Sequence, residues 1–165
     1  KRGFQVSEIS EDDFDQLVDV RQDLEARALE RSIANGNDDW EAEIVANYHK
    51  LARTTPPGLE LEPAGDEERE LRHRRFHHAL LSACGSRWQM RFLEHLTSHI
   101  ERYRRIKTPR SSISKKTARE IETEHRLLME STINRNTTDA LKILGEHRHR
   151  TYSAIKDRFA EDRES

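Results

Sequence analysis

The sequence predicts an all-α fold, an antiparallel bundle of six to seven helices in one domain. The chain of 165 residues has six glycines and four prolines, and long stretches contain neither of these helix breakers. In these stretches apolar residues recur with the 3.6-residue period of an amphipathic helix. A chain near this length buries about 70% of its unfolded surface, which is enough for one core.

The first two predicted helices have clear capping signals. Ser10 can cap a helix with an acidic first turn, and Asn35-Gly36 ends that helix. Its apolar stripe consists of Phe14, Leu17, Val18, Leu24, Ala28 and Leu29. Asn37 or Asp38 caps the second helix, which must end before Pro56-Pro57 because a residue before proline disfavours the helical conformation. Its apolar residues are Trp40, Ile44, Val45, Tyr48 and Leu51.

The third and fourth predicted helices follow a loop over residues 54–63. The third helix begins near Asp66 and is broken by Gly85-Ser86. Its overlapping turns carry Leu71, His73, His77, Leu80, Leu81 and Cys84. The fourth helix spans about residues 87–107. We expect its buried row to be Trp88, Phe92, Leu96, Ile100 and Tyr103.

The last two predicted helices follow a loop that contains Pro109 and the serines at 111, 112 and 114. The segment Asn134-Arg135-Asn136 closes the fifth helix, and Thr137 or Thr138 caps the sixth. One face of the fifth helix consists of Ile121, His125, Leu128 and Thr132. The matching face of the sixth consists of Ala140, Ile143, Leu144, His147, Thr151 and Ile155.

Composition excludes several classes of protein. The 29 basic and 31 acidic residues give a net charge of −2, so the chain lacks the positive field of a stand-alone nucleic-acid binder. The single cysteine, Cys84, excludes an internal disulfide, and we expect it to be a small buried apolar residue. No apolar run approaches the roughly 20 residues that span a bilayer, and no signal peptide is visible. We therefore expect a cytoplasmic protein with no membrane partner.

Four histidines fall on the apolar stripes of three predicted helices. His73 and His77, at positions i and i+4, share one helix face, and His125 and His147 come from two further helices. Burying an imidazole without a partner costs on the order of 1 to 3 kcal/mol, and a shared cation removes that cost. Imidazole suits zinc, nickel, copper and iron, so the pattern predicts a metal site. The remaining histidines, expected at the surface or its boundary, are His49, His78, His95, His99 and His149.

Two other interpretations of these residues stay open. Each histidine can be a satisfied core residue, which would leave a metal-free helical module. The sequence also reads Glu-x-x-His at residues 70–73 and 122–125, the spacing of ferritin-like bundles that hold two metal ions. Such a bundle enzyme needs further glutamates, for which Glu25 and Glu101 are candidates, and Glu124 is the only obvious general base. No other catalytic motif is present, so we expect a protein that is not an enzyme.

Four segments carry motifs that occur together in one known family. Residues 21–25 read Arg-Gln-Asp-Leu-Glu, and residues 73–81 carry a Phe-His pair before an apolar run. A Glu-His pair at 124–125 precedes Leu127 and Leu128, and Asp139 precedes His147 by eight residues. In this order and spacing, nearly the whole chain resembles the FCD domain, the effector-binding domain of GntR-type transcription regulators of the FadR subfamily.

The resemblance implies a helical domain that dimerises and binds a divalent metal beside a small carboxylate effector. By position, His77, His125 and His147 match the family's three histidine ligands. His73 stands where the family usually has an aspartate, which makes the ligand set neutral and favours zinc or nickel, one ion per chain. The same replacement is also compatible with a subgroup that has lost the metal.

The resemblance also implies an effector contact and a missing DNA-binding half. Arg21 is the expected anchor for the effector carboxylate, with a surface salt bridge to Glu25 as its alternative role. Arg102 and Tyr103 are further candidate effector residues. Residues 1–9 resemble the end of the wing and linker of a winged helix-turn-helix domain, and residues 10–165 the effector-binding and dimerisation domain. We therefore expect a homodimer that binds operator DNA through an N-terminal domain absent from this chain.

Overall fold

The computed structural model describes residues 10–54, 63–107 and 114–164, and in these ranges it contains six helices and no strand. The helices are α1 (Glu11–Asn35), α2 (Asp38–Ala52), α3 (Pro63–Leu81), α4 (Arg87–Lys107), α5 (Lys115–Ile133) and α6 (Thr137–Glu164). The predicted all-α bundle is confirmed. The expected wing and linker at residues 1–9 and most of the two expected loops lie outside the described residues.

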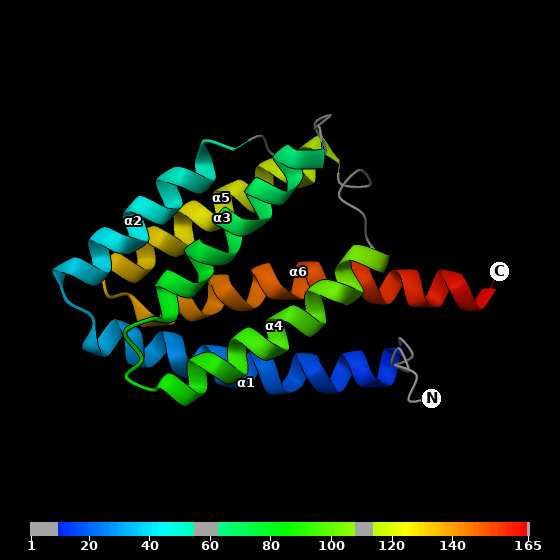
Figure 1. Cartoon of the computed structure of the whole chain (residues 1–165), viewed down its shortest axis with the longest axis horizontal. Coiled ribbons are helices and arrows are strands. Elements are labelled where there is room, and N and C mark those ends of the chain that lie inside the picture. Colours follow the sequence, from blue (N-terminus) through cyan, green and yellow to red (C-terminus); the bar gives the residue numbers. More distant parts are fainter. Residues whose placement is uncertain (1–9, 55–62, 108–113, 165) are drawn as a thin grey trace, which may run out of the picture.

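The helices form two groups that meet along the middle of the molecule. In Figure 1, α1 and α6 run along the long axis and α4 crosses them obliquely, whereas α2, α3 and α5 lie together at one side and are inclined to α1 and α6. The closest packing joins α2 with α3, α5 with α6, and α1 with both α4 and α6. The first turn of α1 and the last turn of α6 lie at the same end of the molecule, where Arg163 pairs with Glu11.

Side-chain caps define the helix starts that the sequence predicted. The Ser10 side chain accepts a hydrogen bond from the backbone of Asp13, and Asn37 accepts one from the backbone of Trp40. Between α1 and α2, Gly36 lies against the Trp40 ring so closely that a Cβ atom would overlap the ring carbons. Only glycine fits this turn without displacing the tryptophan.

Two predicted boundaries are wrong. Helix α3 already begins at Pro63, because proline at a first helical position has its fixed φ and needs no hydrogen-bond partner for nitrogen. Helix α6 is capped by Asn136, whose side chain accepts from the backbone of Asp139 at 3.2 Å, instead of by Thr137 or Thr138. Arg135 directly precedes this cap with a φ of 57°. Its guanidinium donates to the backbone oxygen of Ile33, in the last turn of α1, and to that of Gly36.

The predicted buried row of α4 is also wrong in its first half. Trp88 and Phe92 are 61% and 55% exposed, whereas Leu93 is buried in their place. The predicted Ile100 and Tyr103 are buried. Apolar residues occur on two sides of this helix, so the helical period alone did not determine which side faces the core.

The core consists of two apolar clusters separated by a polar layer. The larger cluster joins all six helices, with Leu93 as the buried residue from α4, and contains Cys84 as expected. The smaller cluster, around Phe14, lies between α1, α4 and α6. On α1 and α6 the residues between the two clusters are buried and polar; they are Arg21, Glu25, His147 and Arg148. The fold therefore places ionisable groups in the interior, where water is scarce and charge interactions are strong.

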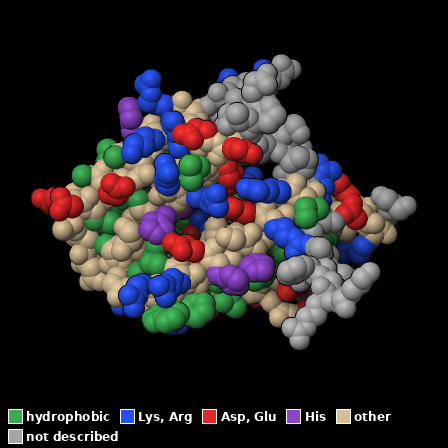
Figure 2. Space-filling view, viewed as in Figure 1, with side chains coloured by type: hydrophobic (Ala, Val, Ile, Leu, Met, Phe, Trp, Pro, Cys, Tyr) green, Lys and Arg blue, Asp and Glu red, His purple; other side chains and the backbone are tan. Residues whose placement is uncertain are grey.

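The surface carries mixed charge. Lys, Arg, Asp and Glu side chains are interspersed on the face shown in Figure 2, in agreement with the near-neutral composition. The five histidines predicted at the surface or its boundary are all exposed. Among the described residues, every helix is too short or too polar to cross a bilayer.

Candidate metal centre

The four predicted histidines converge. One potential ligand nitrogen from each of His73, His77, His125 and His147 lies within 4.8 Å of the other three. The Nε2 atoms of His77 and His125 are 3.4 Å apart, and the rings of His77 and His147 stack with their centroids 5.2 Å apart. His77, His125 and His147 are buried, and His73 is half-buried. Helices α3, α5 and α6 thus bring together residues up to 74 positions apart in the sequence.

The spacing of these nitrogens fits a divalent metal. Two nitrogens bound tetrahedrally to zinc at about 2.1 Å lie about 3.4 Å from each other, which is the separation of the two Nε2 atoms. The wider separations in the group, up to 4.8 Å, need a contraction of up to about 1.4 Å, which side-chain rotation can supply. The donor set of four nitrogens suits zinc or nickel better than magnesium or calcium.

Burial keeps the four rings in the form that can bind a metal. Burial holds the pKa of His73, His77 and His125 well below its usual range, and the nearby imidazoles and arginines lower it further. Burial also lowers the pKa of His147, although the Glu124 carboxylate opposes this shift. At neutral pH each ring is therefore neutral and has a lone pair available.

A carboxylate orients His147. The Nδ1 atom of His147 lies 3.0 Å from a carboxylate oxygen of Glu124, and Arg150 donates to the other oxygen at 2.7 Å. With Nδ1–H donated to Glu124, Nε2 of His147 keeps the free lone pair. Carboxylates in this position fix the tautomer of metal-binding histidines and increase their basicity.

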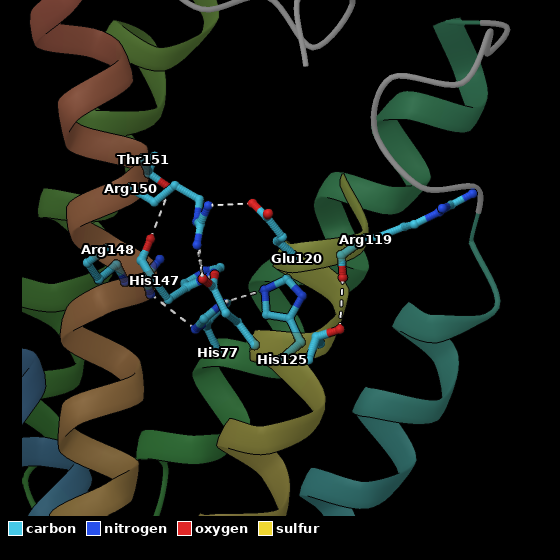
Figure 3. Close-up of polar contacts among 10 residues, drawn as sticks. His77, Arg119, Glu120, His125, His147, Arg148, Arg150 and Thr151 are labelled. Atoms are coloured by element: carbon cyan, nitrogen blue, oxygen red, sulfur yellow. Dashed lines mark hydrogen bonds and ion pairs between the residues drawn. The ribbon is translucent and has the colours of Figure 1, made fainter. Parts of the chain in front are cut away.

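His77 has a different partner. Arg148 Nη2 lies 3.1 Å from Nδ1 of His77 (Figure 3), and because a guanidinium only donates, that nitrogen accepts. The proton of the neutral ring is then on Nε2, next to His125. Metal binding through this atom requires the proton to move to Nδ1 and the Arg148 guanidinium to withdraw from it.

An arginine pair beside the histidines shares one carboxylate. Glu25 accepts from Arg148 at 2.5 and 3.0 Å and pairs with Arg21 at 3.5 Å, and all three side chains are buried. Burial by itself would raise the pKa of Glu25, but the attraction of the two arginines holds it at about 2. The three groups together carry one excess positive charge. Arg21 Nε has no hydrogen-bond partner among the described residues, and Arg21 Nη1 donates to the Tyr152 hydroxyl at 3.4 Å.

These groups line one cavity of about 1130 Å³. Its wall includes the four histidines and Arg21, Glu25, Arg148 and Tyr152. Arg102 and Tyr103 are not among its lining residues; Tyr103 lies in the smaller apolar cluster, and its hydroxyl donates to Asp13. Arg104, the residue directly after Tyr103, lines the cavity and pairs with Glu70.

Sequence reasoning missed Arg148, which contacts both a histidine and Glu25. A signal was present, since Arg148 lies in a buried row of α6 whose other members are Leu144, Tyr152, Ile155 and Phe159. An arginine in an otherwise apolar row predicts a buried acidic partner. Sequence alone did not identify that partner, because Glu25 lies on another helix.

The glutamates that a two-metal site would need are engaged by arginines. Glu25 pairs with Arg148, Glu70 with Arg104 and Glu122 with Arg69. Glu101 pairs with Arg74 at 3.5 Å. Among the described residues, the group with metal-binding spacing consists only of histidines. This arrangement disfavours the ferritin-like interpretation.

Comparison with known proteins identifies related sequences. Residues 16–150 match the FCD domain family. The chain is 34% identical over 156 residues to the HTH-type transcriptional regulator BphR of Paraburkholderia xenovorans, and 30% identical over 150 residues to the HTH-type transcriptional repressor GlaR of Escherichia coli. The two matches cover 94% and 89% of this chain, but only 62% and 66% of the length of the two relatives.

Solved structures share the fold. A GntR-family transcriptional regulator from Pseudomonas syringae superposes with a TM-score of 0.74 at 20% identity, over 96% of this chain and 61% of that one. The metal-free FCD domain of TM0439 superposes with a TM-score of 0.67 at 16% identity, over 94% of this chain and 99% of that one. At these identities the superpositions support the helical architecture alone.

Proposed function

Because this chain belongs to the FCD domain family of GntR-family regulators, we propose that it senses a small organic acid through a divalent metal. One observation carries the proposal: four neutral histidines with metal-binding spacing lie in the wall of a cavity that also contains a buried arginine pair with excess positive charge. The relatives are named as transcriptional regulators, so the output of sensing is a change in DNA binding.

His73, His77, His125 and His147 would hold one zinc or nickel ion. When bound, the ion supplies a positive centre with open positions for an oxygen ligand. Four neutral imidazoles leave its double charge uncompensated, which favours an anionic effector. Glu124 already orients His147 for metal binding, and His77 joins it once Arg148 has withdrawn from Nδ1.

Arg21 would bind the effector carboxylate. Its side chain lies in the cavity wall, its Nε atom is buried without a partner among the described residues, and it shares Glu25 with Arg148. A carboxylate that accepts from Arg21 would satisfy the unpaired N–H and neutralise the excess charge. The Tyr152 hydroxyl, already in contact with Arg21, offers the same ligand a second hydrogen bond.

In this proposal, the protein is a cytoplasmic homodimer that binds operator DNA. The helix-turn-helix domain that would contact DNA lies outside this chain, in line with its partial coverage of the relatives. An effector changes DNA affinity only through different affinities for two arrangements of the dimer. Since the polar layer lies between α1 and α6, a ligand there can change how these helices pack.

Metal analysis combined with melting temperatures tests the proposal. The purified chain is analysed for bound metal and then melted with a panel of mono- and dicarboxylates, with and without a chelator. We expect about one zinc or nickel ion per chain at the buried centre and a carboxylate-dependent rise in melting temperature that the chelator abolishes. His77→Ala and His125→Ala should lose both signals, whereas the exposed His49→Ala should keep them. A carboxylate shift that survives both substitutions would place the ligand elsewhere, and a chain without metal would support the metal-free module.

A further inference from the structure

The outer face of α4 carries a stripe that the core does not use. Trp88, Phe92 and Ile106 are exposed large apolar residues on this helix. At a rotation of about 100° per residue around the helix axis, these three residues lie within about 40° of one direction. Three polar residues lie in the same sector. The full stripe is Trp88, Phe92, His95, His99, Arg102 and Ile106. Figure 2 shows hydrophobic and histidine side chains next to each other over α4 on the near face.

Two exposed histidines occupy the middle of this stripe. His95 and His99 are separated by one helical turn, and their ring centroids are 4.6 Å apart. Histidines at i and i+4 on one helix face can bind the same metal ion. Two imidazoles leave a tetrahedral zinc ion with two open positions, so a closed site needs two more ligands from elsewhere.

The stripe is complementary to a second copy of itself. Its successive spacings are 4, 3, 4, 3 and 4 residues, which read the same in both directions along the helix. Two copies of α4 that cross antiparallel at residue 97 therefore place Trp88 opposite the partner's Ile106, and His95 opposite the partner's His99. An interhelical distance of about 8 to 10 Å allows side chains of this length to meet.

We propose that His95 and His99 form a second metal site, shared with the same two residues of a second copy of this chain. The four imidazoles meet at the two-fold axis, and the aromatic and aliphatic side chains at the two ends of the stripe pack around them. This inference rests on the homodimer of the proposed function. It adds a divalent ion, held between subunits, that strengthens dimerisation and is distinct from the buried centre.

Zinc alone tests the shared site. Metal-depleted chain is titrated with zinc while metal uptake is measured by competition with a dye and association by sedimentation equilibrium. We expect uptake of about one and a half ions per chain, one at the buried centre and half of one at the axis. Between one and one and a half equivalents, the dimer dissociation constant should fall by about tenfold or more. The variant His95→Asn/His99→Asn should take up about one ion and show no change in association.

A matched control removes two other exposed histidines. His49→Asn/His149→Asn should behave as the unchanged chain, since these residues lie on different helices. Equal zinc uptake by the unchanged chain and the His95/His99 variant would overturn the site. Uptake of two ions per chain without a change in association would show that the site is not shared between two subunits. A dimer indifferent to zinc leaves the homodimer standing and refutes this inference alone, whereas a chain monomeric throughout refutes both.

Discussion

Lowering the pH from 7.5 to 5.5 should strongly destabilise the metal-free protein. Burial holds the pKa of His73, His77 and His125 well below the ordinary value, and lowers that of His147. These rings stay neutral in the folded chain, whereas in the unfolded chain they gain protons as the pH falls through about 6.5. The unfolded state then binds more protons than the folded state, so the free energy of unfolding decreases as the pH is lowered.

The size of the effect follows from the ordinary pKa. For each ring that stays neutral when folded, protonation of the unfolded chain lowers the free energy of unfolding by about 1.4 kcal/mol between pH 7.5 and 5.5. The three most strongly shifted histidines together give about 4 kcal/mol, and His147 adds up to another 1.4 kcal/mol, roughly. Carboxylates contribute little in this interval because they titrate below about pH 5 even when unfolded. A loss of this size is a large fraction of the total stability of a typical domain, about 5 to 15 kcal/mol.

Denaturant unfolding at the two pH values, in the presence of a chelator, measures this loss. His125→Leu should reduce the difference between the two pH values by about 1.4 kcal/mol, whatever it does to stability at pH 7.5. The exposed His49→Asn should leave the difference unchanged. A total loss below about 1.4 kcal/mol, the value for one imidazole, would mean that the four rings are not both buried and neutral in the folded chain.

Three substitutions test the surroundings of the site and the fold. Glu25→Gln leaves two buried arginines without their shared carboxylate and should cost about 3 to 5 kcal/mol of stability in denaturant unfolding. Glu124→Gln weakens the orientation of His147 and should lower metal affinity about 10- to 100-fold in a competition titration. Gly36→Ala puts a methyl group into the Trp40 ring and should cost about 1 to 3 kcal/mol, read as a lower melting temperature.

Each substitution has a matched control in the chain. Asp15→Asn breaks only the exposed pair with Lys156 and should cost less than about 1 kcal/mol. Glu130→Gln changes a surface pair and should leave metal affinity unaltered. Gly145→Ala adds a methyl group in open space within a helix and should be neutral or stabilising. If a control variant matched its test variant in effect, the contact that the test variant removes would contribute nothing specific to stability or metal binding.

The sequence predicted the parts of this protein that depend on local rules. Helix caps such as Ser10 and Asn37 depend on a hydrogen bond three residues away, so the starts of α1 and α2 were predictable. The histidine stripes were equally visible, because residues at i and i+4 must share a helix face. Their convergence could be expected, since a buried imidazole on each of three helices needs a partner.

Tertiary structure alone decided which faces meet and which charges pair. Trp88 and Leu93 lie on different sides of α4, and only the packing of α1 and α6 against that helix determines which one is buried. Arg148 could be paired with any acidic residue until folding placed it beside Glu25, 123 positions away. Local sequence specifies what each helix can bury, whereas long-range contacts depend on the simultaneous packing of all helices, which no single segment encodes.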